Sequence, residues 1–158
     1  MPSFEIWSED RGGAIIAAHQ GQDGATLPIL HALQNAFGCI PPEALPMVAS
    51  ALNLTRAELH GIVTFYHDFR DAPPGAHVLK LCRAEACQAM GADALAADAK
   101  RVLGIYWGET TPDGRVTLEP VFCLGLCACA PAAMVDGKVI GALDRQKLDA
   151  IIAEAKQR

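Results

Sequence analysis

Two short stretches, Cys82-Arg-Ala-Glu-Ala-Cys87 and Cys123-Leu-Gly-Leu-Cys127, contain four of the six cysteines of this 158-residue chain. Each pair follows a short apolar run that is typical of a β-strand. Loops at neighbouring strand ends can turn thiolates toward one point, and four thiolates around one point suit tetrahedral zinc or an iron–sulfur cluster. The spacing therefore predicts a metal centre formed by the two pairs.

The spacing alone leaves the metal open. Structural zinc sites favour gaps of about two to four residues, which both pairs satisfy. The run after Cys127, residues 128–134, is small and apolar, and Gly125 lies inside the loop. Such a wall favours a cluster, because backbone N–H groups can approach its sulfides while water is kept out. A thioredoxin-type dithiol needs Cys-x-x-Cys, which the sequence lacks. An iron–sulfur centre is preferred, and a zinc-stabilised scaffold module is the alternative.

The first half of the chain has the periodicity of short amphipathic helices. Apolar residues recur at helical spacing over 25–37, and again over 43–52 after the Pro41-Pro42 break. Thr55-Arg-Ala-Glu58 is a capping box that begins another helix, and residues 14–19 suggest a shorter one. We expect a small helical bundle, followed by a linker at residues 71–75, which read Asp-Ala-Pro-Pro-Gly.

The second half mixes strands and helices. We expect strands over 77–81 and 115–122, one helix over 87–102, a hairpin over 134–140 and a last helix capped by Asp144. Asp136-Gly137 suits the type I′ turn of such a hairpin. This order predicts an α/β layer fold. The chain is thus expected to hold a helical domain over 1–75 and an α/β domain over 76–158.

Composition and charge exclude several classes of function. The net charge is −5, and neither half is basic, so nucleic-acid binding is not expected. No apolar run approaches the roughly 20 residues of a membrane span, so direct membrane insertion is not expected either. The N-terminus lacks the basic and apolar segments of a secretory signal, which predicts a cytoplasmic protein.

Four motifs resemble one known family, the thioredoxin-like 2Fe–2S ferredoxins. This family includes the peripheral NADH-side subunit of respiratory NADH:quinone oxidoreductase. The motifs are Gly61-Ile-Val-Thr-Phe-Tyr66, Leu81-Cys-Arg-Ala-Glu-Ala-Cys87, Gly108-Glu-Thr-Thr-Pro-Asp-Gly114 and Cys123-Leu-Gly-Leu-Cys127-x3-Pro131. The resemblance implies a helical bundle followed by a thioredoxin-like 2Fe–2S domain. It also implies that Cys82, Cys87, Cys123 and Cys127 bind the iron of one 2Fe–2S cluster.

The resemblance also implies partners. The chain would be a non-catalytic electron-transfer subunit beside a flavoprotein subunit that carries FMN and binds NAD. The short tail and the run after Cys123 most resemble the gamma subunit of soluble NAD-dependent formate dehydrogenase, which implies a larger molybdenum or tungsten iron–sulfur catalytic subunit. The equivalent subunit of respiratory NADH:quinone oxidoreductase, or of an NAD-reducing hydrogenase, is the alternative.

A few residues near these motifs have open roles. Cys129 departs from the family pattern and is interpreted as a small wall residue, with a spare ligand as the alternative. Cys39 is expected to be a packed thiol of the helical half. Arg83 follows a ligand directly and either raises the cluster's potential or is a solvated surface residue. Phe65 and Tyr66 are expected in the core, or else at a contact with the other half or the flavoprotein.

Overall fold

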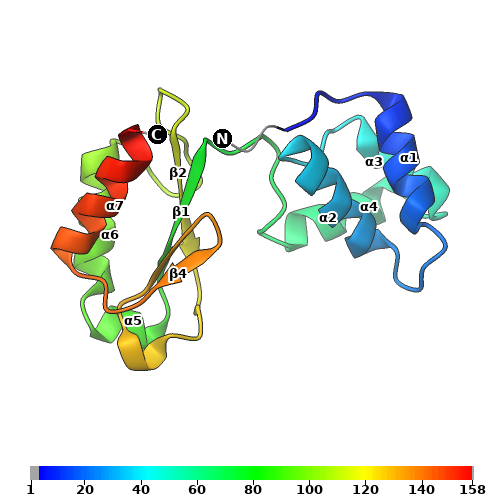
Figure 1. The fold of residues 1–158 in the computed structure, drawn as a ribbon. Helices are drawn as coiled ribbons and strands as arrows, with labels where there is room; N and C mark the ends of the chain where they lie inside the picture. The colour runs from blue at the N-terminus through cyan, green and yellow to red at the C-terminus, as the bar shows by residue number, and fades with distance from the viewer. Residues whose placement is uncertain (1–3, 158) are drawn as a thin grey trace. The chain divides into compact units, whose positions relative to one another are not determined.

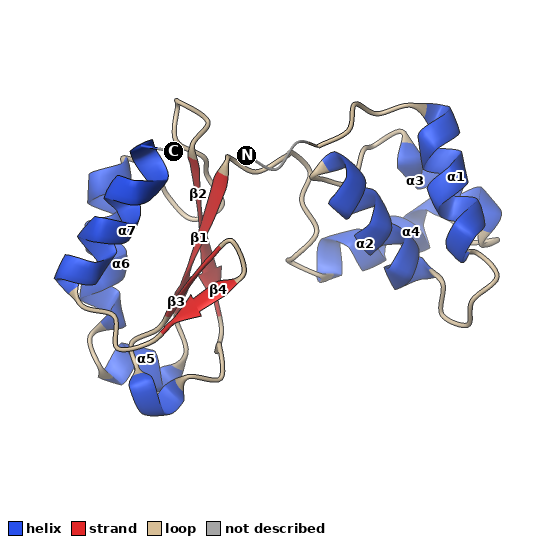
Figure 2. Cartoon of the chain, viewed as in Figure 1, coloured by secondary structure: helices blue, strands red, loops and turns tan. Residues whose placement is uncertain are grey.

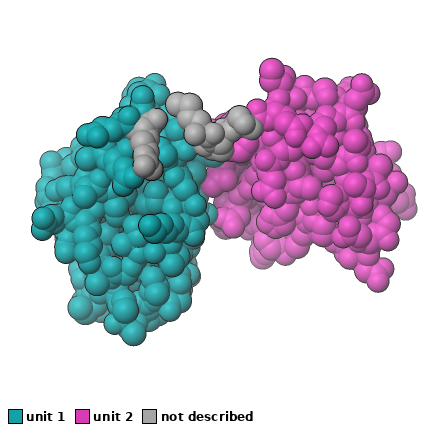
Figure 3. Space-filling model, in the orientation of Figure 1, with its two compact units in different colours: residues 1, 74–158 teal, residues 2–73 magenta. Residues whose placement is uncertain are grey.

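A computed structural model describes residues 4–157. They form two compact units, one that extends to Pro73 and one that begins at Pro74 (Figure 3). The first unit is all-helical, and the second combines helices with a sheet (Figure 2). The predicted α/β class with an N-terminal helical bundle is therefore confirmed, whereas the domain limits 1–75 and 76–158 stay a prediction. Within residues 4–157, no helix is both long and apolar enough to cross a membrane.

The first unit consists of α1 (Glu9–His19), α2 (Thr26–Phe37), α3 (Ala44–Ala51) and α4 (Arg56–Phe65). Helix α1 packs against α2 and α3, and α3 packs against α4. The apolar stripes seen in the sequence meet in one core, where the fully buried side chains include Ile29, Leu30, Leu33, Val48 and Leu59.

The helix ends of this unit follow local sequence signals. The Thr55 hydroxyl accepts a bond from the Glu58 backbone N–H at 3.2 Å, and the Glu58 carboxylate accepts one from the Thr55 N–H at 2.8 Å. This is the reciprocal capping box that the sequence predicts. Gly38 ends α2 with a left-handed φ of 79°, as expected of a glycine at a helix C-terminus.

A four-stranded sheet in the order β2-β1-β3-β4 forms the frame of the second unit. Strand β1 (His77–Cys82) pairs in parallel with β2 (Val116–Val121) and antiparallel with β3 (Ala133–Val135). Strand β3 forms a hairpin with β4 (Lys138–Ile140). Asp136 and Gly137 at its tip have φ values of 49° and 82°, which confirms the predicted type I′ turn.

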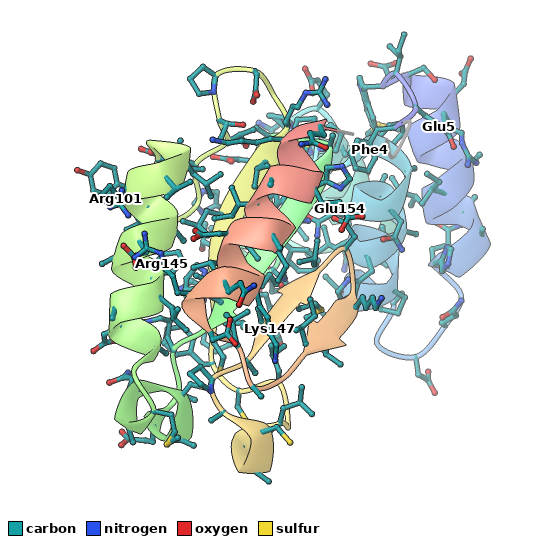
Figure 4. The ribbon with its side chains drawn as sticks, turned by 60° about the vertical axis from the view of Figure 1, so that its left-hand side comes forward. Phe4, Glu5, Arg101, Arg145, Lys147 and Glu154 are labelled. Atoms are coloured by element: carbon teal, nitrogen blue, oxygen red, sulfur yellow. The ribbon has the colours of Figure 1, made fainter. Side chains whose placement is uncertain are left out.

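Helices α6 (Ala92–Leu103) and α7 (Arg145–Gln157) lie side by side over one face of the sheet (Figure 1). Asp98 on α6 bonds to Arg101 and to Arg145 of α7, and both arginines point from neighbouring helices in Figure 4. Asp144 accepts a bond from the Lys147 N–H at 2.8 Å, so the predicted cap of the last helix is confirmed. The core beneath is apolar and includes Leu79, Leu81, Leu103, Val116, Leu118, Leu148 and Ile152.

One predicted helix is wrong. The sequence predicts a single helix over 87–102, but the chain forms α5 (Glu85–Ala89) and then α6. Gly91, between them, has a φ of 90°, which a continuing helix does not allow. The break gives α5 its own direction, and Cys87 on α5 is 3 % exposed.

Truncation of Leu118 tests this core. Leu118 is fully buried on β2, so Leu118→Ala is expected to lower the free energy of unfolding by about 2–5 kcal/mol. Urea unfolding followed by Trp107 fluorescence, in a Trp7→Phe background, isolates the second unit, because the chain has two tryptophans and Trp7 packs in the first. The matched control Val139→Ala is 48 % exposed and should cost less than about 1 kcal/mol. Equal losses in the two variants would contradict this core.

Candidate metal centre

The four cysteines predicted as ligands lie at one end of the sheet. Cys82 is the last residue of β1, and Cys87 lies on α5. Cys123 follows β2 by two residues, and Cys127 begins the 3-10 helix η1 (Cys127–Cys129). Since β1 and β2 are parallel with Cys82 opposite Val121, the loops after both strands leave from the same end of the sheet.

The two pairs differ in exposure. Cys82 and Cys87 are 2 % and 3 % exposed and form a small apolar cluster with Ala92 and Ala132. Leucines 124 and 126 of the second cysteine loop pack against this cluster. Cys123 and Cys127 are exposed. The site thus has a dry inner pair of thiols and a solvent-facing outer pair.

The two thiols of the outer pair, Cys123 and Cys127, lie close together. The Sγ atoms of Cys123 and Cys127 are 3.6 Å apart. Two thiolates on one tetrahedral metal are roughly 3.8 Å apart when each metal–sulfur bond is about 2.3 Å. Across residues 4–157, no three His, Cys, Asp or Glu side chains are gathered closely enough to hold one ion. The Cys123–Cys127 distance suits two sulfurs on one shared metal, whether iron or zinc.

Backbone N–H groups surround the inner sulfur of Cys82. Burial by itself raises the pKa of the Cys82 thiol. Hydrogen bonds from the backbone of Ala84, from the Cys87 thiol and from the backbone of Cys123 and Leu124 outweigh burial, so the pKa is lowered. These donors come from both cysteine loops, and they stabilise negative charge on sulfur as a metal centre requires.

The other two shifted thiols have raised pKa values. Burial raises the pKa of Cys87, as does its contact with Cys82, while a hydrogen bond from the Ala132 backbone opposes the shift. The hydrogen bond and charge of Cys123 raise the pKa of Cys127, and Cys82 adds to the effect. The pKa of Cys127 therefore depends on a thiol of each pair, so the two pairs interact electrostatically.

The second cysteine loop has an unusual backbone. Cys123 has a φ of 85°, a conformation that non-glycine residues rarely adopt, and Gly125 has a φ of 76°. The loop curls so that the Gly125 N–H lies 3.4 Å from the Cys123 sulfur. This strain is located at the functional end of the sheet, where the rest of the fold holds it in place.

Comparison with known proteins identifies the family. The profile described as Thioredoxin-like [2Fe-2S] ferredoxin matches residues 13–156, nearly the whole chain. The chain belongs to this family. The family resemblance and the thioredoxin-like fold predicted from the motifs are therefore confirmed.

Several relatives of this ferredoxin have named roles. It is 35% identical to the NADP-reducing hydrogenase subunit HndA of Solidesulfovibrio fructosivorans, over 84% of this chain and 78% of that protein. It is 33% identical to NADH-quinone oxidoreductase subunit 2 of Thermus thermophilus, over 85% of this chain and 75% of that protein. A chain in the crystal structure of the air-oxidised NAD+-reducing [NiFe]-hydrogenase is similar in fold, with a TM-score of 0.68 and 28% identity. The match covers 81% of this ferredoxin but 22% of that hydrogenase chain.

The residues left open in the sequence have defined surroundings. Cys129, interpreted as a small wall residue, is exposed, and its role stays a prediction. Cys39 is buried in the helical unit, as predicted, and burial raises the pKa of its thiol. Phe65 and Tyr66 are 73% and 43% exposed, so they do not belong to the core. Sequence reasoning missed Phe122, which precedes Cys123 and is 75% exposed.

Arg83 has two neighbours, one acidic and one aromatic. Its guanidinium bonds to Asp93 at 2.9 Å and lies 5.8 Å from the centroid of the Trp107 ring. Lys100 lies 4.4 Å from the same ring. Arg83 is therefore a partly exposed residue held by an acidic partner, which offsets part of its charge.

Substitution of Cys129 tests whether this ferredoxin uses a fifth thiol. Cys129→Ser is expected to leave the metal content and the visible spectrum unchanged, because Cys129 is not among the four cysteines that the family resemblance implies as ligands. Cys127→Ser is the positive control and should lower the metal content. A metal loss in Cys129→Ser comparable to that in Cys127→Ser would make Cys129 a ligand.

Proposed function

We propose that this ferredoxin binds one 2Fe–2S cluster through Cys82, Cys87, Cys123 and Cys127, and passes single electrons within an NADH-type oxidoreductase or an NAD-reducing hydrogenase. The observation that carries the proposal is the convergence of the four cysteines at the end of β1 and β2 in a chain of the 2Fe–2S family. In this arrangement Cys82 and Cys87 would hold one iron, and Cys123 and Cys127 the other.

When bound, such a cluster accepts and gives up one electron at a time. The protein's own part is to hold the sulfurs and to set their electrostatics. N–H groups of Ala84, Leu124 and Gly125 direct positive dipoles at the ligand sulfurs, which stabilises the added negative charge. The apolar cluster around Cys87 keeps water from the inner pair, and the exposed outer pair leaves one side open for electron exchange.

The nicotinamide and flavin chemistry is assigned to a partner. The sequence has no Gly-x-Gly-x-x-Gly fingerprint for a dinucleotide, and its relatives are named as subunits of larger enzymes. An FMN- and NAD-binding flavoprotein subunit would exchange electrons with the outer pair of thiols. The chain itself is then a non-catalytic subunit, for which we infer a cytoplasmic location.

The relatives favour one parent complex over another. Their names support the hydrogenase and NADH:quinone oxidoreductase assignments, which the sequence analysis gives as alternatives. The formate dehydrogenase assignment, with its molybdenum or tungsten subunit, stays a prediction. Purification of the complex from its native host with a tag on this chain distinguishes them. A co-purifying nickel–iron subunit would indicate a hydrogenase, a molybdenum or tungsten subunit a formate dehydrogenase, and membrane-bound subunits the NADH:quinone oxidoreductase.

Anaerobic purification tests the metal directly. The protein is expected to be reddish-brown, to contain about two iron and two sulfide per chain, and to become EPR-active on one-electron reduction. Serine replacement of Cys82, Cys87, Cys123 or Cys127 should lower the iron content, whereas Cys39→Ser, a buried thiol of the other unit, is the matched control. A colourless, EPR-silent protein with one zinc per chain and no sulfide would overturn the proposal in favour of a zinc scaffold.

The Arg83–Asp93 pair should tune the cluster's potential. Reduction adds one negative charge, which a nearby cation stabilises, so Arg83→Gln is expected to lower the midpoint potential on the order of tens of millivolts. Asp93 then remains without its partner, and Arg83→Gln/Asp93→Asn should return most of the way to wild type. Redox titration followed by EPR measures both. An unchanged potential in the single variant would exclude a role for Arg83.

A further inference from the structure

The chain beyond β4 runs directly against the second cysteine loop at Gly141. A Cβ atom added to Gly141 would lie 2.9 Å from the Cβ of Cys129 and 3.2 Å from its carbonyl oxygen. Carbon atoms in contact prefer separations of about 3.5–4.0 Å. Gly141 does not have a left-handed φ, so the backbone conformation does not require glycine there. The close approach of Cys129 does.

The Gly141 side of this contact cannot move away easily. Ala142 donates its backbone N–H to the carbonyl of Cys129, and its own carbonyl accepts a bond from Lys147 Nζ of α7 at 2.7 Å. Leu143 donates to the carbonyl of Pro131 at 2.8 Å and is buried in the core of the unit. The Lys147 bond and the burial of Leu143 anchor residues 142–143 to the rest of the unit, so a larger residue at 141 would push against the cysteine loop.

The cysteine loop transmits such a displacement to both pairs of ligands. Cys129 is the last residue of the 3-10 helix that Cys127 begins. Three residues further on, the Ala132 carbonyl accepts the Cys82 N–H at 3.0 Å, and the Ala132 N–H bonds to the Cys87 sulfur. The segment 129–132 thus contacts the inner pair directly and is continuous with the outer pair.

We propose that Gly141 is a positioning residue for the metal centre: its missing side chain lets residues 141–143 fix the segment 129–132, and with it the placement of Cys127 and the N–H donor of Cys87. The inference rests on the proposed function, because it assigns the contact a role in holding the cluster. If no metal binds at the cysteines, the same contact would only stabilise the folded chain.

Two glycine substitutions separate these roles. Gly141→Ala is expected to shift the EPR g-values of the reduced protein and to speed iron release to a chelator about tenfold, the effect of losing an outer-shell partner. Gly75→Ala is the matched control. An added Cβ at Gly75 would lie 2.9 Å from the Gly114 carbonyl oxygen, but Gly75 precedes β1 at the end opposite Cys82. It should lower the unfolding temperature and leave the g-values unchanged.

A second-site substitution tests the contact itself. Cys129→Gly removes the Cβ atom that an alanine side chain at position 141 would meet at 2.9 Å. The double variant Gly141→Ala/Cys129→Gly should therefore release iron almost as slowly as Cys129→Gly alone. Cys129→Ser keeps that Cβ and should give no rescue. The rescue identifies contact with Cys129, which a general loss of stability does not predict.

The outcomes distinguish this inference from the proposed function. Wild-type g-values and iron release in Gly141→Ala would overturn the positioning role, and so would equal rescue by Cys129→Gly and Cys129→Ser. A wild-type protein that holds zinc would overturn the iron–sulfur assignment, and zinc release from the same variants would then decide the role of Gly141. A wild-type protein that holds no metal would overturn both.

Discussion

The parallel pairing of β1 with β2 is the constraint on which the metal centre depends. Parallel strands end at the same edge of a sheet, so Cys82 and the loop that carries Cys123 leave from one place although about 40 residues separate them. The intervening chain forms α5, α6 and a return to β2, and that path places Cys87 beneath the same edge. No local motif could assemble the four thiols. The sheet does so, and the loops need only supply the final orientation.

The two ends of the sheet are built differently for this reason. At one end the hairpin tip closes onto β1, where the Asp136 carboxylate bonds the Val78 N–H at 2.8 Å and the His77 ring at 2.7 Å. That end is regular and fully paired. At the other end β1 stays paired through the Cys82 N–H to the Ala132 carbonyl and the Arg83 N–H to the Val121 carbonyl, and the N–H groups directed at sulfur come from the loops just beyond, such as that of Gly125. The strained φ of Cys123 belongs to this second end, held by a frame that is complete elsewhere.

Signals that act within a few residues could be predicted from the sequence, and those that depend on distant neighbours could not. The Thr55–Glu58 capping box, the Asp136-Gly137 turn and the Asp144 cap each need only their own segment, and each prediction is confirmed. The break at Gly91 was missed because the Ala-rich run around it has helical periodicity throughout. The demand for glycine at 141 comes from Cys129, which is remote until the chain folds.

The same limit applies to exposure. Aromatic residues such as Phe65 are buried on average, so sequence reasoning assigned it to the core. A sequence pattern gives the face of a helix but not whether another element covers that face. Four cysteines at two spacings predict a metal centre, yet they do not say which pair faces water. Burial of Cys82 and Cys87 follows from their places on β1 and α5, which only the folded chain defines.

In the proposed complex, the exposure of the outer pair means that a partner would complete the surroundings of the cluster. Charge on a solvent-facing sulfur is stabilised by water, whereas charge on a buried sulfur depends on fixed N–H donors. A partner that covers Cys123, Cys127 and the exposed Phe122 removes that water and strengthens every remaining dipole through the lower local dielectric constant. Under the proposed function the potential of the bound cluster would depend on the assembled complex, with the ferredoxin fixing the inner part of its environment and the partner supplying the outer part.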